Sequence, residues 1–196
     1  AEMTAALRAF VPPLVVERAE AGHSGAWVSE HRKLVTVFVR MMHLGATPCE
    51  VANLETAHAA VGLLQASVDR WCGTVTRIIC DDKGTRVLLA WGLPGRAHED
   101  DEARAVCCTL ERAAELRARP AAAEARSGAE SLGVAAGISS GRVFCCEAGS
   151  ELRREYTLAG AKVNLAARLM QRAANTGIDI LVDAATRAGA AHGPDE

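Results

Sequence analysis

Residues 132–146 read LGVAAGISSGRVFCC, and residues 161–174 read AKVNLAARLMQRAA. The first stretch holds two short apolar runs, Leu132 to Ser139 and Val143 to Cys146, on either side of Ser140-Gly141, and this pattern predicts a β-hairpin. The second stretch has apolar residues at helical spacing, which predicts a helix. This part of the chain therefore predicts two paired strands followed by a helix.

On both sides of this region, short β-branched runs alternate with longer stretches that have apolar residues at helical spacing. The predicted strands are 34–39, 74–79, 87–91 and 178–182, and the predicted helices are 50–71, 99–119 and a short one from 183. The turn Asp81-Asp82-Lys83-Gly84 joins the predicted strands 74–79 and 87–91 as a hairpin. The order βαββαββα with a trailing βα predicts an α+β fold, a ferredoxin-like, mostly antiparallel sheet with helices on one face.

Composition narrows the class of protein. The chain has 196 residues, a formal net charge of −2 and 49% hydrophobic residues, which suits one ordinary globular domain. The near-neutral charge argues against nucleic-acid binding, and no run approaches the ~20 apolar residues of a membrane span. Seven cysteines without a Cys-x-x-Cys spacing argue against a disulfide framework or structural zinc. We expect a soluble, cytoplasmic protein.

The chain divides into two predicted regions. Residues 1–31 contain Pro12, Pro13 and the turn-rich stretch 21–25, so we expect a lead-in arm there. Residues 32–196 hold the predicted strands and helices. Because Met3 is only the third residue, we expect a piece of something longer.

One string is more specific than the rest. Tyr156-Thr157-x-x-Gly160 is followed by Val163-Asn164-Leu165-Ala166-Ala167-Arg168. The stretch 137–170 resembles the class III nucleotidyl cyclases, and most of all the second cyclase homology domain of the soluble, bicarbonate-responsive adenylyl cyclases. Weaker matches extend the likeness over most of the chain, at 7–12, 21–25, 82–84 and 91–95. The resemblance implies a cyclase homology domain at 32–196 that is incomplete at its C-terminus.

Asn164 and Arg168 are the candidate catalytic residues. They are four apart, so they share one face of a helix, and spacing alone favours two solvated polar residues there. In the family that the chain resembles, the matching asparagine holds the ribose and the matching arginine meets the phosphoryl oxygens. These two contacts help the ribose 3′ oxygen to attack the α-phosphate while pyrophosphate leaves. The resemblance therefore implies conversion of ATP to cAMP.

Three further residues are candidates for substrate binding. Thr157 matches the position where adenylyl cyclases read the purine edge, and a hydroxyl can both donate and accept; the alternative is an ordinary strand threonine. The family's base-contacting lysine aligns with Arg77. This residue departs from the family pattern, because the planar guanidinium of arginine replaces the compact ammonium charge of lysine. Lys83 is the alternative cation, although a charged hairpin tip is more often simply solvated.

The two aspartates that bind Mg²⁺ in the catalytic partner domain of this family are missing. Their positions, at the end of the first strand and just after the first hairpin turn, hold Arg40 and Thr85, which cannot bind a divalent metal as carboxylates do. Asp81 and Asp82 are adjacent and point to opposite faces of a strand, so a turn explains them better. We expect no metal site in this chain, with Mg²⁺ bound mainly by a partner.

The resemblance thus implies half of an adenylyl cyclase, completed by a complementary domain with both aspartates, in the same polypeptide or another chain. Arg40 and Thr85 would face the second, degenerate site, where bicarbonate acts as the activator of soluble cyclases. Arg40 would then help to hold an anion, or else form a surface or interfacial ion pair. In isolation we expect an inactive homodimer. Two alternatives stay open: a regulatory or dimerisation module that has kept the fold, and a guanylyl cyclase half with Cys80 near a base-reading position.

Overall fold

The computed structural model describes residues 11, 16, 20, 29–41, 51–81, 84–118, 133–150, 154–191 and 193. Most of the predicted arm 1–31 and the candidate Lys83 lie outside the described residues. The strands are β1 (Glu30–Met41), β2 (Thr74–Asp81), β3 (Gly84–Trp91), β4 (Val134–Gly149), β5 (Arg154–Ala159) and β6 (Ile180–Val182). The helices with defined bounds are α3 (Val51–Arg70), α4 (Asp101–Ala118), α5 (Ala161–Thr176) and α6 (Ala184–Gly189).

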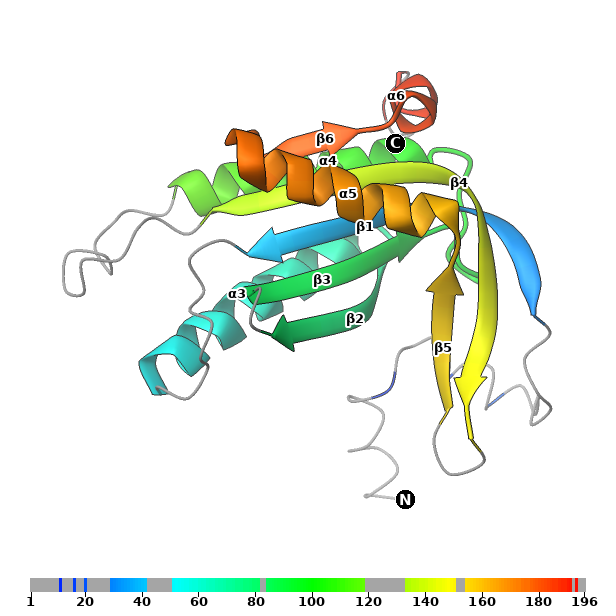
Figure 1. Cartoon of the computed structure of the whole chain (residues 1–196), viewed down its shortest axis with the longest axis horizontal. Coiled ribbons are helices and arrows are strands. Elements are labelled where there is room, and N and C mark those ends of the chain that lie inside the picture. The colour runs from blue at the N-terminus through cyan, green and yellow to red at the C-terminus, as the bar shows by residue number, and fades with distance from the viewer. Residues whose placement is uncertain are drawn as a thin grey trace.

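The strands form one six-stranded sheet in the order β2-β3-β1-β4-β5 (Figure 1). Each neighbouring pair along this path is antiparallel, and β6 pairs with β4 in parallel. The predicted α+β class and the ferredoxin-like, mostly antiparallel sheet are confirmed. The predicted helices 50–71, 99–119 and 161–174 are also confirmed, with ends that differ by at most two residues.

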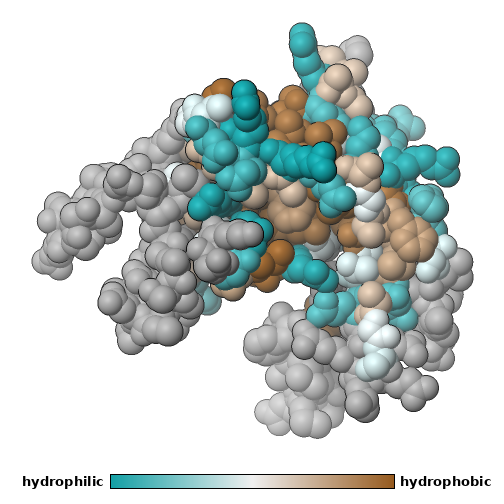
Figure 2. All heavy atoms as spheres, viewed as in Figure 1, coloured by the Kyte–Doolittle hydropathy of each residue, from teal (hydrophilic) through white to brown (hydrophobic). Residues whose placement is uncertain are grey.

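Both faces of the central strands are covered. Val35 and Val37 of β1 belong to the core under α3 and α4. Leu34 of β1 and Leu88 of β3 belong to a second core, which includes Val163 of α5. Strand residues alternate between faces, so α3 and α4 cover one face while α5 lies on the other, in front of the sheet in Figure 1. The prediction that the helices share one face is therefore wrong for α5. Figure 2 shows hydrophilic side chains on this front side of the molecule.

The hairpin predicted around Ser140-Gly141 is wrong. Both residues lie inside β4, which pairs with β1 from Met41↔Val134 to Glu30↔Cys145. The reason is the length of β1, which has 12 residues where the sequence predicts six, and therefore offers a partner to both apolar runs of β4. Gly141, with a φ of 145°, adopts a backbone conformation that favours glycine without reversing the chain. The second hairpin is instead formed by β4 with β5.

None of the helices in the described part of the chain is long and apolar enough to cross a membrane. The six cysteines in that part are all free thiols.

Candidate functional site

Helix α5 presents the two candidate catalytic residues to solvent. It begins directly after Gly160, whose φ of 140° disfavours other residues. Its buried side consists of Val163, Ala166, Met170 and Ala173, whereas Asn164 and Arg168 are exposed. Within the described residues, neither of these two side chains makes a hydrogen bond or an ion pair. An amide and a guanidinium are thus available together on one helix face, as their spacing predicts.

The candidate base-reading residues come from two strands. Thr157 is half-buried on β5, opposite Cys146 of β4. Arg77 of β2 contacts β5 through Glu155, with Nη2 of the arginine 2.9 Å from Oε2 of the glutamate. Glu155 and Thr157 are two residues apart, so their side chains leave the same face of β5. The fold therefore places Arg77 beside the strand that carries Thr157, although the two candidates belong to distant parts of the sequence.

Glu155 is a feature of this region that the sequence did not single out. The side chains of Arg77 and Glu155 are each 46% exposed, so their ion pair contributes only ~0–1 kcal/mol to stability and can open for a ligand. The one feature of the sequence that could have indicated Glu155 is its position two residues before Thr157. Together these three side chains offer donors, a carboxylate acceptor and a hydroxyl, the kinds of group that match the edge of a purine.

Arg40 and Thr85, at the positions to which the resemblance assigns metal-binding aspartates, lie near the end of β1 and near the start of β3. Arg40 faces Arg86 across the β1–β3 pairing, and Thr85 is buried opposite Met41. Arg86 forms an ion pair with Asp81. A guanidinium and a hydroxyl do not supply the carboxylate ligands that Mg²⁺ requires, so Arg40 and Thr85 do not fit this ion. In the described part of the chain, no group of three His, Cys, Asp or Glu side chains could hold a metal ion.

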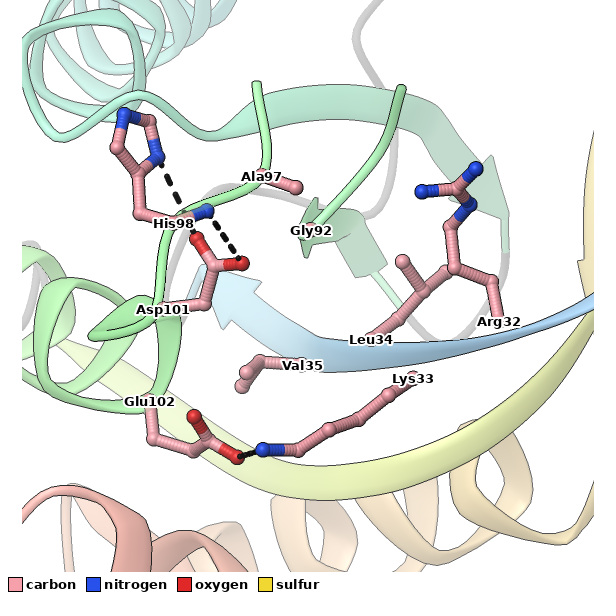
Figure 3. Close-up of a pocket in the computed structure, with 9 residues that line it drawn as sticks. All are labelled: Arg32, Lys33, Leu34, Val35, Gly92, Ala97, His98, Asp101 and Glu102. Carbon is pink, nitrogen blue, oxygen red and sulfur yellow. Dashed lines mark hydrogen bonds and ion pairs between the residues drawn. The ribbon is translucent and has the colours of Figure 1, made fainter. Parts of the chain in front are cut away.

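A separate cavity of about 260 Å³ lies where β1 passes the N-terminus of α4 (Figure 3). In this cavity Lys33 Nζ lies 2.7 Å from Glu102 Oε1, and Asp101 Oδ2 accepts a hydrogen bond from the His98 backbone N–H at 3.1 Å. The other oxygen, Oδ1, is buried, with His98 Nδ1 3.7 Å away. Burial raises the pKa of Asp101 above its ordinary value. This carboxylate therefore opposes folding when it is ionised.

Replacing Asp101 with asparagine is expected to stabilise the chain more at pH 7 than at pH 3. A carboxyl whose pKa is raised by folding contributes stability below its unfolded pKa and loses it as the pH rises through the folded pKa. The amide keeps an acceptor for the His98 N–H but carries no charge. Urea unfolding of both proteins at the two pH values measures the difference, and a difference independent of pH would contradict the prediction.

The chain is similar to known cyclases in sequence and in fold. No protein-family profile matches the chain. Adenylate cyclase type 10 from Rattus norvegicus is 29% identical over 169 residues, which cover 86% of this chain and 10% of that protein. A bacterial light-regulated adenylyl cyclase superposes with a TM-score of 0.77 at 18% identity, covering 96% of this chain and 54% of the other. Over 86% of its length the chain is homologous to adenylate cyclase type 10, and its fold is that of class III adenylyl and guanylyl cyclase domains.

The structural likeness extends to both substrate classes of these enzymes. The guanylyl cyclase Cya2 superposes on this chain with a TM-score of 0.66 at 23% identity, covering 83% of this chain and 80% of the other. At such identity the likeness shows the fold and does not choose between ATP and GTP. The domain spans about 10% of the length of the curated relatives that it matches.

Proposed function

We propose that this cyclase domain is the nucleotide-binding half of an adenylyl cyclase and lacks a metal site of its own. The observation that carries the proposal is the exposed pair Asn164 and Arg168 on α5, in a domain whose metal positions hold Arg40 and Thr85. A complementary domain with both aspartates would supply Mg²⁺ to a site between the two domains. The cytoplasmic location expected from the sequence stays a prediction.

The proposed chemistry divides among this domain's own residues. Asn164 holds the ribose so that its 3′ oxygen lies in line with the α-phosphorus. As the bond from that oxygen to phosphorus forms and the bond to pyrophosphate breaks, Arg168 offsets the negative charge on the phosphoryl oxygens. Thr157 and Arg77 bind the base, with Arg77 released from Glu155 when the nucleotide enters.

The same proposal assigns a different role to the end of β1 that carries Arg40. Arg40 lies opposite Arg86 in the β1–β3 register, and Arg86 is already ion-paired with Asp81. Arg40 makes no ion pair within the described residues, so an anion between the domains at the degenerate site would have a cation to bind. Bicarbonate, the activator that the sequence resemblance implies, has the charge required.

The proposal is tested by mixing domains. We expect no cAMP from ATP and Mg²⁺ with this chain alone, because a homodimer has no aspartate pair. Adding a separately purified cyclase domain that carries both aspartates should raise the rate by about 100-fold or more. If the mixture forms no cAMP although the two domains are shown to be folded and bound to each other, the result would favour the regulatory or dimerisation module instead.

The guanylyl cyclase half is the second candidate. Cys80 is exposed near the end of β2, and its Sγ lies 3.5 Å from the Thr85 hydroxyl. The Arg77–Glu155 pair also offers a carboxylate that could accept from the ring N–H of guanine. Competition between ATP and GTP in the mixed assay separates the two, because cGMP as the main product would replace the adenylyl assignment.

A further inference from the structure

Asp183 connects three elements around the start of α5. It is the N-cap residue of α6, and its backbone N–H donates to the Ile138 carbonyl of β4 at 3.0 Å. Its Oδ2 accepts from Lys162 Nζ at 2.9 Å and from the Ser139 hydroxyl at 2.8 Å. Its Oδ1 accepts from the Thr186 N–H at 2.8 Å and the Thr186 hydroxyl at 2.7 Å. Both oxygens are therefore fully used by β4, α5 and α6.

This carboxylate is charged and held in place. Its side chain is only 9% exposed. Burial alone would raise the pKa of Asp183, but the hydrogen bonds from Thr186, Lys162 and Ser139 outweigh burial and lower it. The Lys162 side chain is 31% exposed, so the ion pair lies at the edge of the buried region and is less screened than a surface pair.

Lys162 connects the fixed carboxylate of Asp183 to the first turn of α5. It is the second residue of the helix and lies two residues before Asn164. Its stem crosses Gly141 of β4, where an added Cβ would lie 2.7 Å from the lysine Cε. Gly160, the N-cap residue of α5, makes no side-chain capping hydrogen bond. The contact with Asp183 is therefore a side-chain tether for a helix start that lacks a side-chain cap.

We infer that Asp183 is a positioning residue, which acts through Lys162 to fix the first turn of α5 and with it the direction of Asn164 and Arg168. This inference rests on the proposed function, since it assigns a support to the same site. Asp183 lies outside the stretch 156–168 that marks the site in the sequence, and its carboxylate oxygens are occupied by groups of this chain. Catalysis by side chains that orient a substrate is sensitive to displacements of about 1 Å. Greater freedom of the first turn of α5 should therefore reduce turnover.

The test compares Asp183→Asn and Lys162→Met with Arg187→Gln in the mixed assay. Asparagine keeps an acceptor for the Thr186 N–H, and methionine keeps the stem over Gly141 without its charge. Arg187 is an exposed residue of α6 whose side chain makes no hydrogen bond or ion pair with Asp183, so its replacement is the matched control. We expect both test variants to lower kcat about 10-fold, with a smaller change in KM, and the control to retain its rate.

Two further measurements separate positioning from simple stability. The double variant should be no slower than the slower single variant, because both changes break one contact. Hydrogen exchange of this chain alone should show faster exchange of the backbone amides at 164–168 in both variants and not in the control. If Asp183→Asn does not fold, Lys162→Met carries the test.

The outcomes distinguish the two ideas. A wild-type mixture that forms no cAMP counts against the proposed function. If hydrogen exchange of the amides at 164–168 is then also unchanged in the two variants, the positioning role is overturned as well. An active wild-type mixture in which Asp183→Asn and Lys162→Met keep the wild-type kcat overturns the positioning role alone.

Discussion

Alanine at Asn164 or Arg168 should reduce cAMP formation by the mixed domains by about 100-fold or more, as for loss of a group that stabilises a transition state. Both side chains are exposed and have no partner in the described part of the chain, so their loss removes no contact that supports the fold. Alanine also has the highest helix propensity. We therefore expect the melting temperature of each variant to stay within about 2 °C of the wild type.

The matched control is Arg172→Ala, which removes the same side chain one turn further along α5. Arg172 is also exposed and lies four residues after Arg168. If the helix acts only as a positively charged surface, both arginine variants lose activity to the same extent. If Arg168 meets the phosphoryl oxygens, Arg172→Ala keeps most of the rate. Full activity of both Asn164→Ala and Arg168→Ala would overturn the role assignment.

The parts of the fold that depend on local pattern were predictable. The spacing of apolar residues located α3, α4 and α5, because each has a buried side that repeats every three or four residues. The pairing of β4 was not predictable from its own residues. Ser140-Gly141 has the composition of a turn, yet β1 extends from Glu30 and pairs with the whole of β4. The partner strand decides between a hairpin and one long strand, and local composition does not contain that information.

In the candidate site too, residues within one element were predictable, whereas contacts between separate elements were not. Asn164 and Arg168 were predictable because a single helix carries them at a spacing of four. The Arg77–Glu155 pair was not, because it joins β2 to β5, whose order in the sheet places them at opposite edges. Contacts of this kind depend on the curvature of the whole sheet. The link from Asp183 to Lys162 is likewise a contact between separate elements, whose two partners are 21 positions apart in the sequence.

Replacing Gly137 with alanine should cost about 3 kcal/mol or more of unfolding free energy, at the upper end of the range for overpacking. Gly137 lies on β4 beneath α5, where an added Cβ would sit 2.1 Å from the Ala166 carbonyl oxygen and 2.3 Å from the Met170 amide nitrogen. These neighbours are backbone atoms of a helix, so they cannot rotate aside as a flexible side chain can. The whole of α5 must move away from the sheet, or the glycine position must distort.

The control for this prediction is Gly62→Ala on α3, where an added Cβ meets nothing within 4 Å. Because glycine is a poor residue for a helix interior, this change should stabilise the chain by up to about 1 kcal/mol. Urea unfolding of the two variants thus measures one chemical change with opposite expected signs. Equal effects would show that α5 does not pack on β4 as closely as the distances at Gly137 require. A loss of stability at Gly137 should be accompanied by a loss of turnover, since the helix that must move carries Asn164 and Arg168.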